Sequence, residues 1–289
     1  MTATGTIKRL RKSGHYRTKK RLLSEIVGYG GDFYERIYDS RGGFLNIPYA
    51  YEGMESSPKK PSQKIPNITT LWNLPFNRGG YMFASTMGHH HPPGDFPIQE
   101  IYEFLGYGTM LISSEKETVI YLCRPGSKLT VPPDCSMTIL NLSHQKLTTI
   151  DMANPKKNKS DKTEIEQKGP MIAIYNTGSS PYSEEVSLNQ GSYRLPLGGT
   201  VKMVLNSRYQ QLGLRKDAIV EFRTGIGAES LLEKILEKER ELKELGIRVS
   251  CAEQTLEIET SQKRFSIDSL ERISLDSDKL LHHILGIME

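Results

Sequence analysis

The sequence predicts a mainly β protein built around one β-sandwich or β-barrel. Between residues 67 and 205, short runs rich in β-branched and aromatic residues recur with Gly and Pro between them. Strands spaced by roughly 8–12 residues in this way are typical of a sandwich or barrel. The flanking segments differ in composition, so we expect three parts. These are a basic N-terminal arm and extension (1–64), the strand-rich core (65–205) and a small α+β C-terminal appendix (206–289).

Length and composition exclude several classes of protein. The chain has 289 residues, of which 37% are hydrophobic and 25% charged, enough for a substantial core and against wholesale disorder. No apolar run approaches the roughly 18–20 residues of a membrane span, and the basic N-terminus lacks the apolar segment of a signal peptide. Cys123, Cys135 and Cys251 show no CxxC spacing. We therefore expect a cytoplasmic protein without a membrane partner.

The net charge of +4 is concentrated near the N-terminus. Residues 8–21 contain eight Lys and Arg and no acid. Such a segment can contact nucleic acid or a phosphorylated ligand, or be a solvated arm. Tyr16 is its single aromatic residue, so the interleaving of charge and aromatic rings typical of nucleic-acid binding is missing, and a nucleic-acid partner is not expected.

Periodicity and composition predict further elements outside the barrel strands. Residues 18–38 carry a short helical pattern, and the polar residues 155–168 are expected to form a surface loop or hairpin tip. The segment 228–245 predicts one amphipathic helix that ends at Gly246, with an apolar face of Leu231, Leu232, Ile235, Leu236, Leu242 and Leu245. Residues 266–286 are also expected to be helical.

Three consecutive histidines form the most informative motif. His89, His90 and His91 are followed by Glu100, which begins the next strand-like run. Side chains alternate along a strand, so His89 and His91 are expected to share one face while His90 points away. Two imidazoles and a carboxylate that converge from adjacent strands can hold a divalent first-row metal. The alternative is a His-rich turn at the surface.

A second motif completes a pattern known from one family. The first part is Thr86-Met87-Gly88-His89-His90-His91, then Glu100-Ile101-Tyr102, Gly106 and Gly108. The second part is Pro125-Gly126, Pro132-Pro133, Met137 and Asn141, with Ile68-Thr69 upstream and Ala173-Ile174-Tyr175 and Tyr182 downstream. Over residues 65–185 the chain resembles the cupin superfamily, and most of all the cupin-type glucose-6-phosphate isomerases of archaea and bacteria.

The resemblance implies a fold, a metal and a reaction. It implies a cupin (jelly-roll) barrel that holds one divalent ion (Fe, Mn, Zn or Ni) through His89, His91 and Glu100. Glu100 would also shuttle the proton of an aldose–ketose isomerisation, with Tyr102 orienting it. The family's phosphate-binding positions fall on Thr69, Thr86 and Gly88, and its sugar-binding positions on Tyr175 and Tyr182. A homodimer acting on a sugar phosphate such as glucose 6-phosphate or fructose 6-phosphate, in glycolysis and gluconeogenesis, is therefore expected.

Two departures from the family pattern keep other functions open. Met137 stands where the family has its fourth metal ligand, a histidine, and a thioether is a poor ligand for the hard and borderline divalent metals. The spacing between His91 and Glu100 is two residues longer than in the family. His144 could replace the missing ligand only if the strand is bent. The alternatives are a non-catalytic, ligand-binding cupin and a non-haem Fe(II) oxygenase with a 2-His-1-carboxylate site.

Overall fold

The computed structural model describes most of the chain between Tyr16 and Ser266. The described residues are 16–22, 48–56, 67–71, 74–75, 80–86, 88–91, 93, 100–152, 161, 163–178, 180–188, 191–252, 257–259 and 264–266, some strands by their backbone alone. The helical pattern expected after residue 266 lies outside them.

The described elements are predominantly strands, which confirms the predicted fold class. The first half of the chain contains β1 (Tyr16–Leu22), β2 (Pro48–Ser56), β3 (Asn67–Leu71), β4 (Leu74–Pro75), β5 (Tyr81–Met82), β6 (His89–His91), β7 (Glu100–Phe104), β8 (Gly108–Ser113), β9 (Thr118–Cys123), β10 (Lys128–Val131) and β11 (Cys135–Asn141). The second half contains β12 (Leu147–Met152), α4 (Thr163–Lys168), β13 (Ile172–Asn176), β14 (Ser183–Leu188), β15 (Gly191–Pro196), β16 (Gly199–Leu205), η4 (Gln210–Leu212), β17 (Ala218–Thr224), α5 (Ala228–Glu237), α6 (Glu239–Glu244), β18 (Ile247–Cys251), β19 (Glu257–Glu259) and β20 (Arg264–Ser266).

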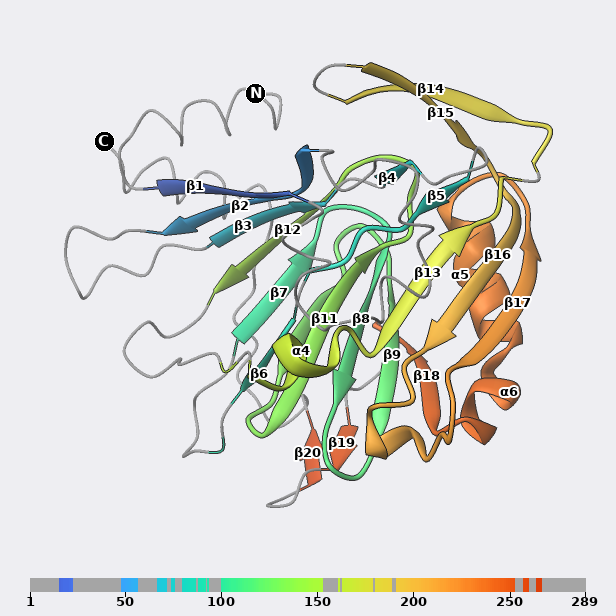
Figure 1. Ribbon diagram of the computed structural model, residues 1–289. Coiled ribbons are helices and arrows are strands. Elements are labelled where there is room, and N and C mark those ends of the chain that lie inside the picture. Colours follow the sequence, from blue (N-terminus) through green and yellow to red (C-terminus); the bar gives the residue numbers. More distant parts are fainter. Residues whose placement is uncertain are drawn as a thin grey trace.

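Three large sheets form the body of the molecule (Figure 1). One has the order β1-β2-β3-β12-β7-β10, the second β18-β9-β8-β11-β6, and the third β17-β16-β13-β5-β4. All pairs within them are antiparallel except β18 with β9, which is parallel. The β14–β15 hairpin forms a separate two-stranded sheet that extends from the top of the body in Figure 1.

The second sheet lies between two apolar cores, and its sequence reflects this position. Every residue of β8 and β9 is buried, and alternate side chains enter different cores. Met110, Ile112 and Tyr121 enter the barrel core, which the first sheet closes. Leu111 and Ile120 enter a second core with β13, β16, β17 and the C-terminal helices. A strand covered on both faces carries a nearly continuous apolar run instead of a polar–apolar alternation.

The segment 80–91 joins the second and third sheets. Its first part pairs with β13, where the Phe83 N–H donates to the Ile174 carbonyl (2.9 Å). Its later part follows β11, through the Asn141 N–H to the Ala84 carbonyl (2.8 Å) and then the pairing of β6 with β11. This one segment therefore connects both cores and carries the three histidines.

The N-terminal and C-terminal segments are part of these sheets. Strands β1 and β2 extend the first sheet beyond β3, so this sheet crosses the boundary expected at residue 65. Beyond residue 205, β17 pairs with β16 and β18 pairs with β9. In the described residues, no helix is both long and apolar enough to cross a membrane.

Three sequence expectations about local structure are wrong. Residues 18–22, the start of the helical pattern expected over 18–38, belong to strand β1, because pairing with β2 overrides a weak periodicity; the rest of that pattern lies outside the described residues. Thr163–Lys168, expected to be loop, is helix α4, and Ile165 anchors it. The helix expected over 228–245 breaks at Lys238, and Leu236 is 43% exposed although it was assigned to the apolar face. Gly246 does adopt the left-handed conformation expected at a helix end (φ 85°).

Candidate functional site

Strand β6 places two of the three histidines inside the barrel. In its pairing with β11, His89 lies opposite Met137 and His91 opposite Cys135. Directly opposed residues of an antiparallel pair point to the same face, and both Met137 and Cys135 belong to the barrel core. The rings of His89 and His91 are stacked, with centroids 4.8 Å apart and planes 18° apart. His91 is fully buried, while His89 is half-buried.

His90 points to the other face of the sheet, as strand alternation predicts. Its Nδ1 lies 3.2 Å from Ser136 Oγ, and its Nε2 lies 3.8 Å from Asp134 Oδ1. The backbone of His90 is bridged to Asp161, just before α4, with the His90 N–H donating at 2.7 Å and the Asp161 N–H at 3.0 Å. His90 therefore belongs to the packing of the α4 segment and not to the barrel interior.

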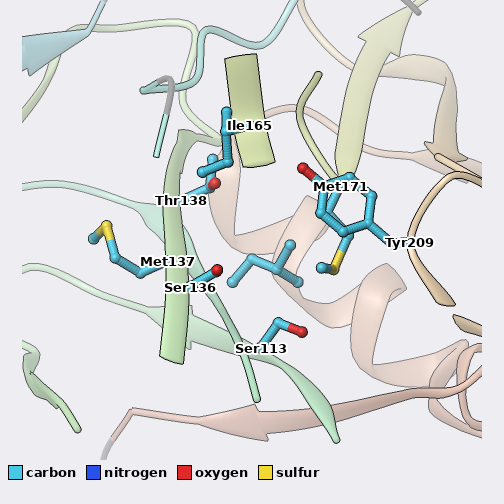
Figure 2. Close-up of a pocket in the computed structure, with 8 residues that line it drawn as sticks. Ser113, Ser136, Met137, Thr138, Ile165, Met171 and Tyr209 are labelled. Carbon is cyan, nitrogen blue, oxygen red and sulfur yellow. The ribbon is translucent and has the colours of Figure 1, made fainter. Parts of the chain in front are cut away.

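The position of Met137 is the one that the family pattern assigns to a ligand. Figure 2 shows the Met137 side chain on one side of β11, directed away from the side chains of Ser136 and Thr138. All three residues contribute to the lining of a small cavity, together with Ile165, Met171 and Tyr209. The Met137 side chain is 3% exposed and directly opposite His89. Beside it, burial is the main cause that raises the pKa of the Cys135 thiol, so the thiol is neutral at ordinary pH. The neighbours of the histidine pair on β11 are thus a thioether and a neutral thiol.

Glu100 begins strand β7, in the sheet that closes the barrel. Its backbone lies opposite Val131, and its side chain lies outside the described part of the chain. Val131 is followed by Pro132, Pro133 and Asp134 before Cys135 pairs with His91. This short connection brings the start of β7 and the end of β6 to the same end of the barrel. Tyr102, two residues further along β7, is buried in the barrel core.

The first sheet contributes a carboxylate that sequence reasoning missed. Asp151 on β12 lies opposite Tyr102 and is 5% exposed. Asn67 Nδ2 donates to Asp151 Oδ2 over 2.9 Å. Because directly opposed residues share a face, its carboxylate lies on the same interior face as Tyr102, so it is a candidate for the site. The signal in the sequence was a lone acid in the otherwise apolar and threonine-rich run 147–152.

The predicted phosphate-binding residues are only partly grouped. Thr69 is on β3, on the same face as the buried core residue Leu71. Thr86 lies beside β11, where its Oγ1 accepts a hydrogen bond from the Ile139 N–H (3.0 Å). Gly88 has a φ of 78°, and a Cβ there would lie 2.3 Å from the Met137 carbonyl oxygen. The side of Gly88 that lacks a Cβ is therefore filled by β11 and not open to a ligand.

The two predicted sugar-binding tyrosines lie apart from each other. Tyr175 on β13 is opposite Met82 and Lys202, and burial, partly offset by Lys202, raises its pKa. Tyr182 is 58% exposed and lines a surface cavity that includes none of the other predicted site residues. His144 also lies elsewhere, because its Nε2 is 3.0 Å from Glu184 Oε2 at the start of the β14–β15 hairpin.

His89 and His91 could supply two imidazole ligands to one metal ion. Imidazole is a good ligand for Fe, Ni, Cu and Zn, and an apolar surrounding protects such a site from water. Among the described side chains, no three His, Cys, Asp or Glu groups lie close enough together to share one ion. Glu100, whose side chain lies outside that set, is the third ligand that the sequence predicts.

Comparisons with known proteins yield structural matches but no sequence relatives. The sequence matches no known protein-family profile and no curated protein sequence. Capsular polysaccharide assembling protein CapF from Staphylococcus aureus matches at 16% identity and a TM-score of 0.30, over 40% of this chain and 32% of that one. The Drosophila melanogaster CENP-C cupin domain matches at 8% identity and a TM-score of 0.28, over 36% and 68%. An oxalate oxidase in complex with glycolate matches at 10% identity and a TM-score of 0.29, over 52% and 56%.

These matches are too distant to say what the chain does. The chain spans about a third of the length of the CapF structure. The fold class therefore rests on the strand topology described above, and function rests on the side chains of this chain.

Proposed function

We propose that the chain is a metal-dependent cupin enzyme that interconverts an aldose phosphate and a ketose phosphate. The observation that supports this proposal most is the pair His89 and His91, stacked on the interior face of the barrel while His90 is turned outward. The reaction and the substrate class come from the family resemblance. A homodimer is part of the same proposal, and light scattering at micromolar concentration tests it.

The roles of the residues follow from their positions. His89 and His91 would hold the ion, with Glu100 as the third ligand. When bound, a divalent metal supplies Lewis-acid polarisation of a carbonyl oxygen. The isomerisation also needs a base that moves a proton between two neighbouring carbons, and a carboxylate suits this task. Glu100 on β7 and the buried Asp151 on β12 are two carboxylates of the closing sheet that share a face with Tyr102, which lies opposite Asp151.

A non-catalytic, ligand-binding cupin is the second candidate, and Met137 favours it. A buried thioether stands directly opposite His89, where a fourth nitrogen ligand would complete the site. In addition, the predicted sugar-binding Tyr182 lies in a separate surface cavity. A barrel of this kind could keep its shape after losing its chemistry.

Metal content and isomerase rate, measured together, distinguish the two candidates. The parent is compared with Met137→His, which adds a ligand, and with Met137→Leu, which keeps an apolar side chain of similar size. We expect the parent to need added metal for its isomerase rate. We expect Met137→His to tighten metal binding about 10-fold or more, which corresponds to about 1.4 kcal/mol.

The rate is measured as glucose 6-phosphate to fructose 6-phosphate conversion without oxygen, so that an oxygenase does not contribute. Met137→Leu should behave like the parent, because it neither adds nor removes a ligand. A parent without metal and without a rate in excess Fe(II), Mn(II) or Zn(II) would overturn the proposal in favour of the second candidate.

A further inference from the structure

A surface cavity outside the barrel carries an inference of its own. It has a volume of about 340 Å³ and lies at the base of the β14–β15 hairpin. Three segments form its walls. The first is residues 180–182 before β14, the second is Leu197 with the first two residues of β16, and the third is residues 223–226, from the end of β17 toward α5. This volume is within the range of about 300–1,000 Å³ that small-molecule sites occupy.

The walls of this cavity are held together before any ligand binds. Gly198 has a φ of 81°, and a Cβ there would lie only 2.5 Å from the Gly225 carbonyl oxygen, so two walls meet where only glycine fits. Ser180 Oγ donates to the Leu197 carbonyl (2.7 Å), which ties the first wall to the second. The Gly225 N–H donates to Ser230 Oγ (2.7 Å) and fixes the third wall to α5. When the walls of a cavity are already ordered, ligand binding costs less conformational entropy.

The charge of the lining points to an anion. Arg223 is the charged residue among the described residues that line the cavity, and no carboxylate lines it. Thr200 lies directly opposite Arg223 across the strands and adds a hydroxyl on the same face. Glu221, the nearest acid on this face of β17, is paired with Lys202 (3.1 Å). Within the described part of the chain Arg223 has no ion-pair partner, so its guanidinium is available to a carboxylate.

The apolar part of the lining points to a ring. Tyr182 is 58% exposed and Ile226 is 56% exposed, and both line the cavity. They are two of the four large hydrophobic side chains that are exposed in the described part of the molecule. Exposed apolar side chains that gather at a concave site mark binding surfaces more often than chance placement does. A flat apolar group can stack on the Tyr182 ring while its charge reaches Arg223.

We infer that this cavity binds a small organic anion in which a carboxylate is carried on an aromatic or apolar ring. The site is separate from the histidine pair and does not depend on the proposed isomerase reaction. Arg223 would bind the carboxylate, Tyr182 and Ile226 would cover the ring, and the backbone contacts at Gly198 would keep the cavity open.

The test is a titration of the 289-residue chain with benzoate, in which NMR chemical-shift changes report binding. Benzamide serves as the neutral analogue and acetate as the analogue without a ring, and both should bind about 10-fold or more weakly than benzoate. Arg223→Gln should weaken benzoate binding about 10-fold or more, the effect of losing a charge-assisted hydrogen bond. Tyr182→Ala should also weaken it.

Two control variants make the result decisive. Arg215→Gln removes an exposed arginine outside the cavity and should bind benzoate like the parent. His91→Ala should also bind it like the parent, because the barrel site is not involved. The inference is overturned by three results: no saturable benzoate binding, equal binding of benzamide, or equal losses in Arg223→Gln and Arg215→Gln.

Discussion

Neighbouring histidines in this chain have different environments because strand geometry separates them. His91 is buried against Cys135 in the barrel, whereas His90 contacts Ser136 on the other face. We predict that His91→Ala abolishes binding of a divalent metal and that His90→Ala leaves it intact. Isothermal titration calorimetry with Zn(II) measures both variants. Equal losses in the two variants would show that the metal does not bind at the interior face.

Two glycines with positive φ differ in what surrounds them. At Gly88 a Cβ would lie 2.3 Å from the Met137 carbonyl oxygen and 2.4 Å from Thr138 Oγ1, while at Gly213 nothing lies within 4 Å. Both substitutions by alanine strain the backbone, at a cost of about 1 kcal/mol. Gly88→Ala must in addition displace strand β11.

We therefore predict that Gly88→Ala lowers the free energy of unfolding by several kcal/mol more than Gly213→Ala. Urea unfolding followed by circular dichroism measures the difference. Similar losses in both variants would mean that the contact between Gly88 and β11 is not a close one.

At the scale of elements, helix α5 has one face buried in the second core and one face exposed. Ile235 is fully buried in the second core, and Leu236, the next residue, is 43% exposed. We predict that Ile235→Ala lowers the free energy of unfolding by about 2–5 kcal/mol, as for other large-to-small changes in cores. Leu236→Ala should cost below about 1 kcal/mol. Thermal or urea unfolding of both variants checks this, and the reverse order would place the other face of α5 on the core.

Helix α4 buries one apolar residue of an otherwise polar sequence. Ile165 is 5% exposed, and Figure 2 shows it beside Thr138 of β11. The acidic residues Glu164 and Glu166 lie in its first turn and Lys168 in its last, an arrangement that suits the helix dipole. Composition alone predicted a loop here, because a single isoleucine gives no periodicity.

At the scale of the whole molecule, buried ionisable groups predict how stability depends on pH. Burial is the main cause that raises the pKa of Tyr81, Tyr121, Cys123 and Cys135 above their ordinary values. In alkaline solution the unfolded chain therefore releases protons that the folded chain retains, and the free energy of unfolding falls as the pH rises. Below about pH 8 these groups are protonated in both states and contribute no slope.

We therefore predict that these four side chains do not change the urea midpoint up to about pH 8. Above that pH they lower it, first as the thiols and then as the phenols of the unfolded chain lose their protons. Unfolding curves at a series of pH values measure the decline. A double variant, Cys123→Ala with Cys135→Ala, should show a shallower slope at the start of the decline. A midpoint that rises with pH would contradict the burial of these groups.

The sequence by itself determined the class of fold and the face of the histidines. Both follow from local rules: the rhythm of short apolar runs predicts strands, and the two-residue period of a strand puts His89 and His91 together. The resemblance to the cupin motifs assigned Met137 to the position of a fourth metal ligand, and the pairing of β6 with β11 places it opposite His89. The strands and the orientation of the histidines could be predicted because each depends on residues that are neighbours in the chain.

The tertiary structure alone decided which distant segments share a sheet and a cavity. The pairing of β1 and β2 with β3, the parallel addition of β18 to β9, and the helix at 163–168 depend on contacts between residues far apart in sequence. So does the burial of Asp151 opposite Tyr102, and so does the separation of Tyr182 from the other predicted site residues. The physical reason is that burial is a property of the assembled sheets, and no local pattern encodes what covers a strand's second face.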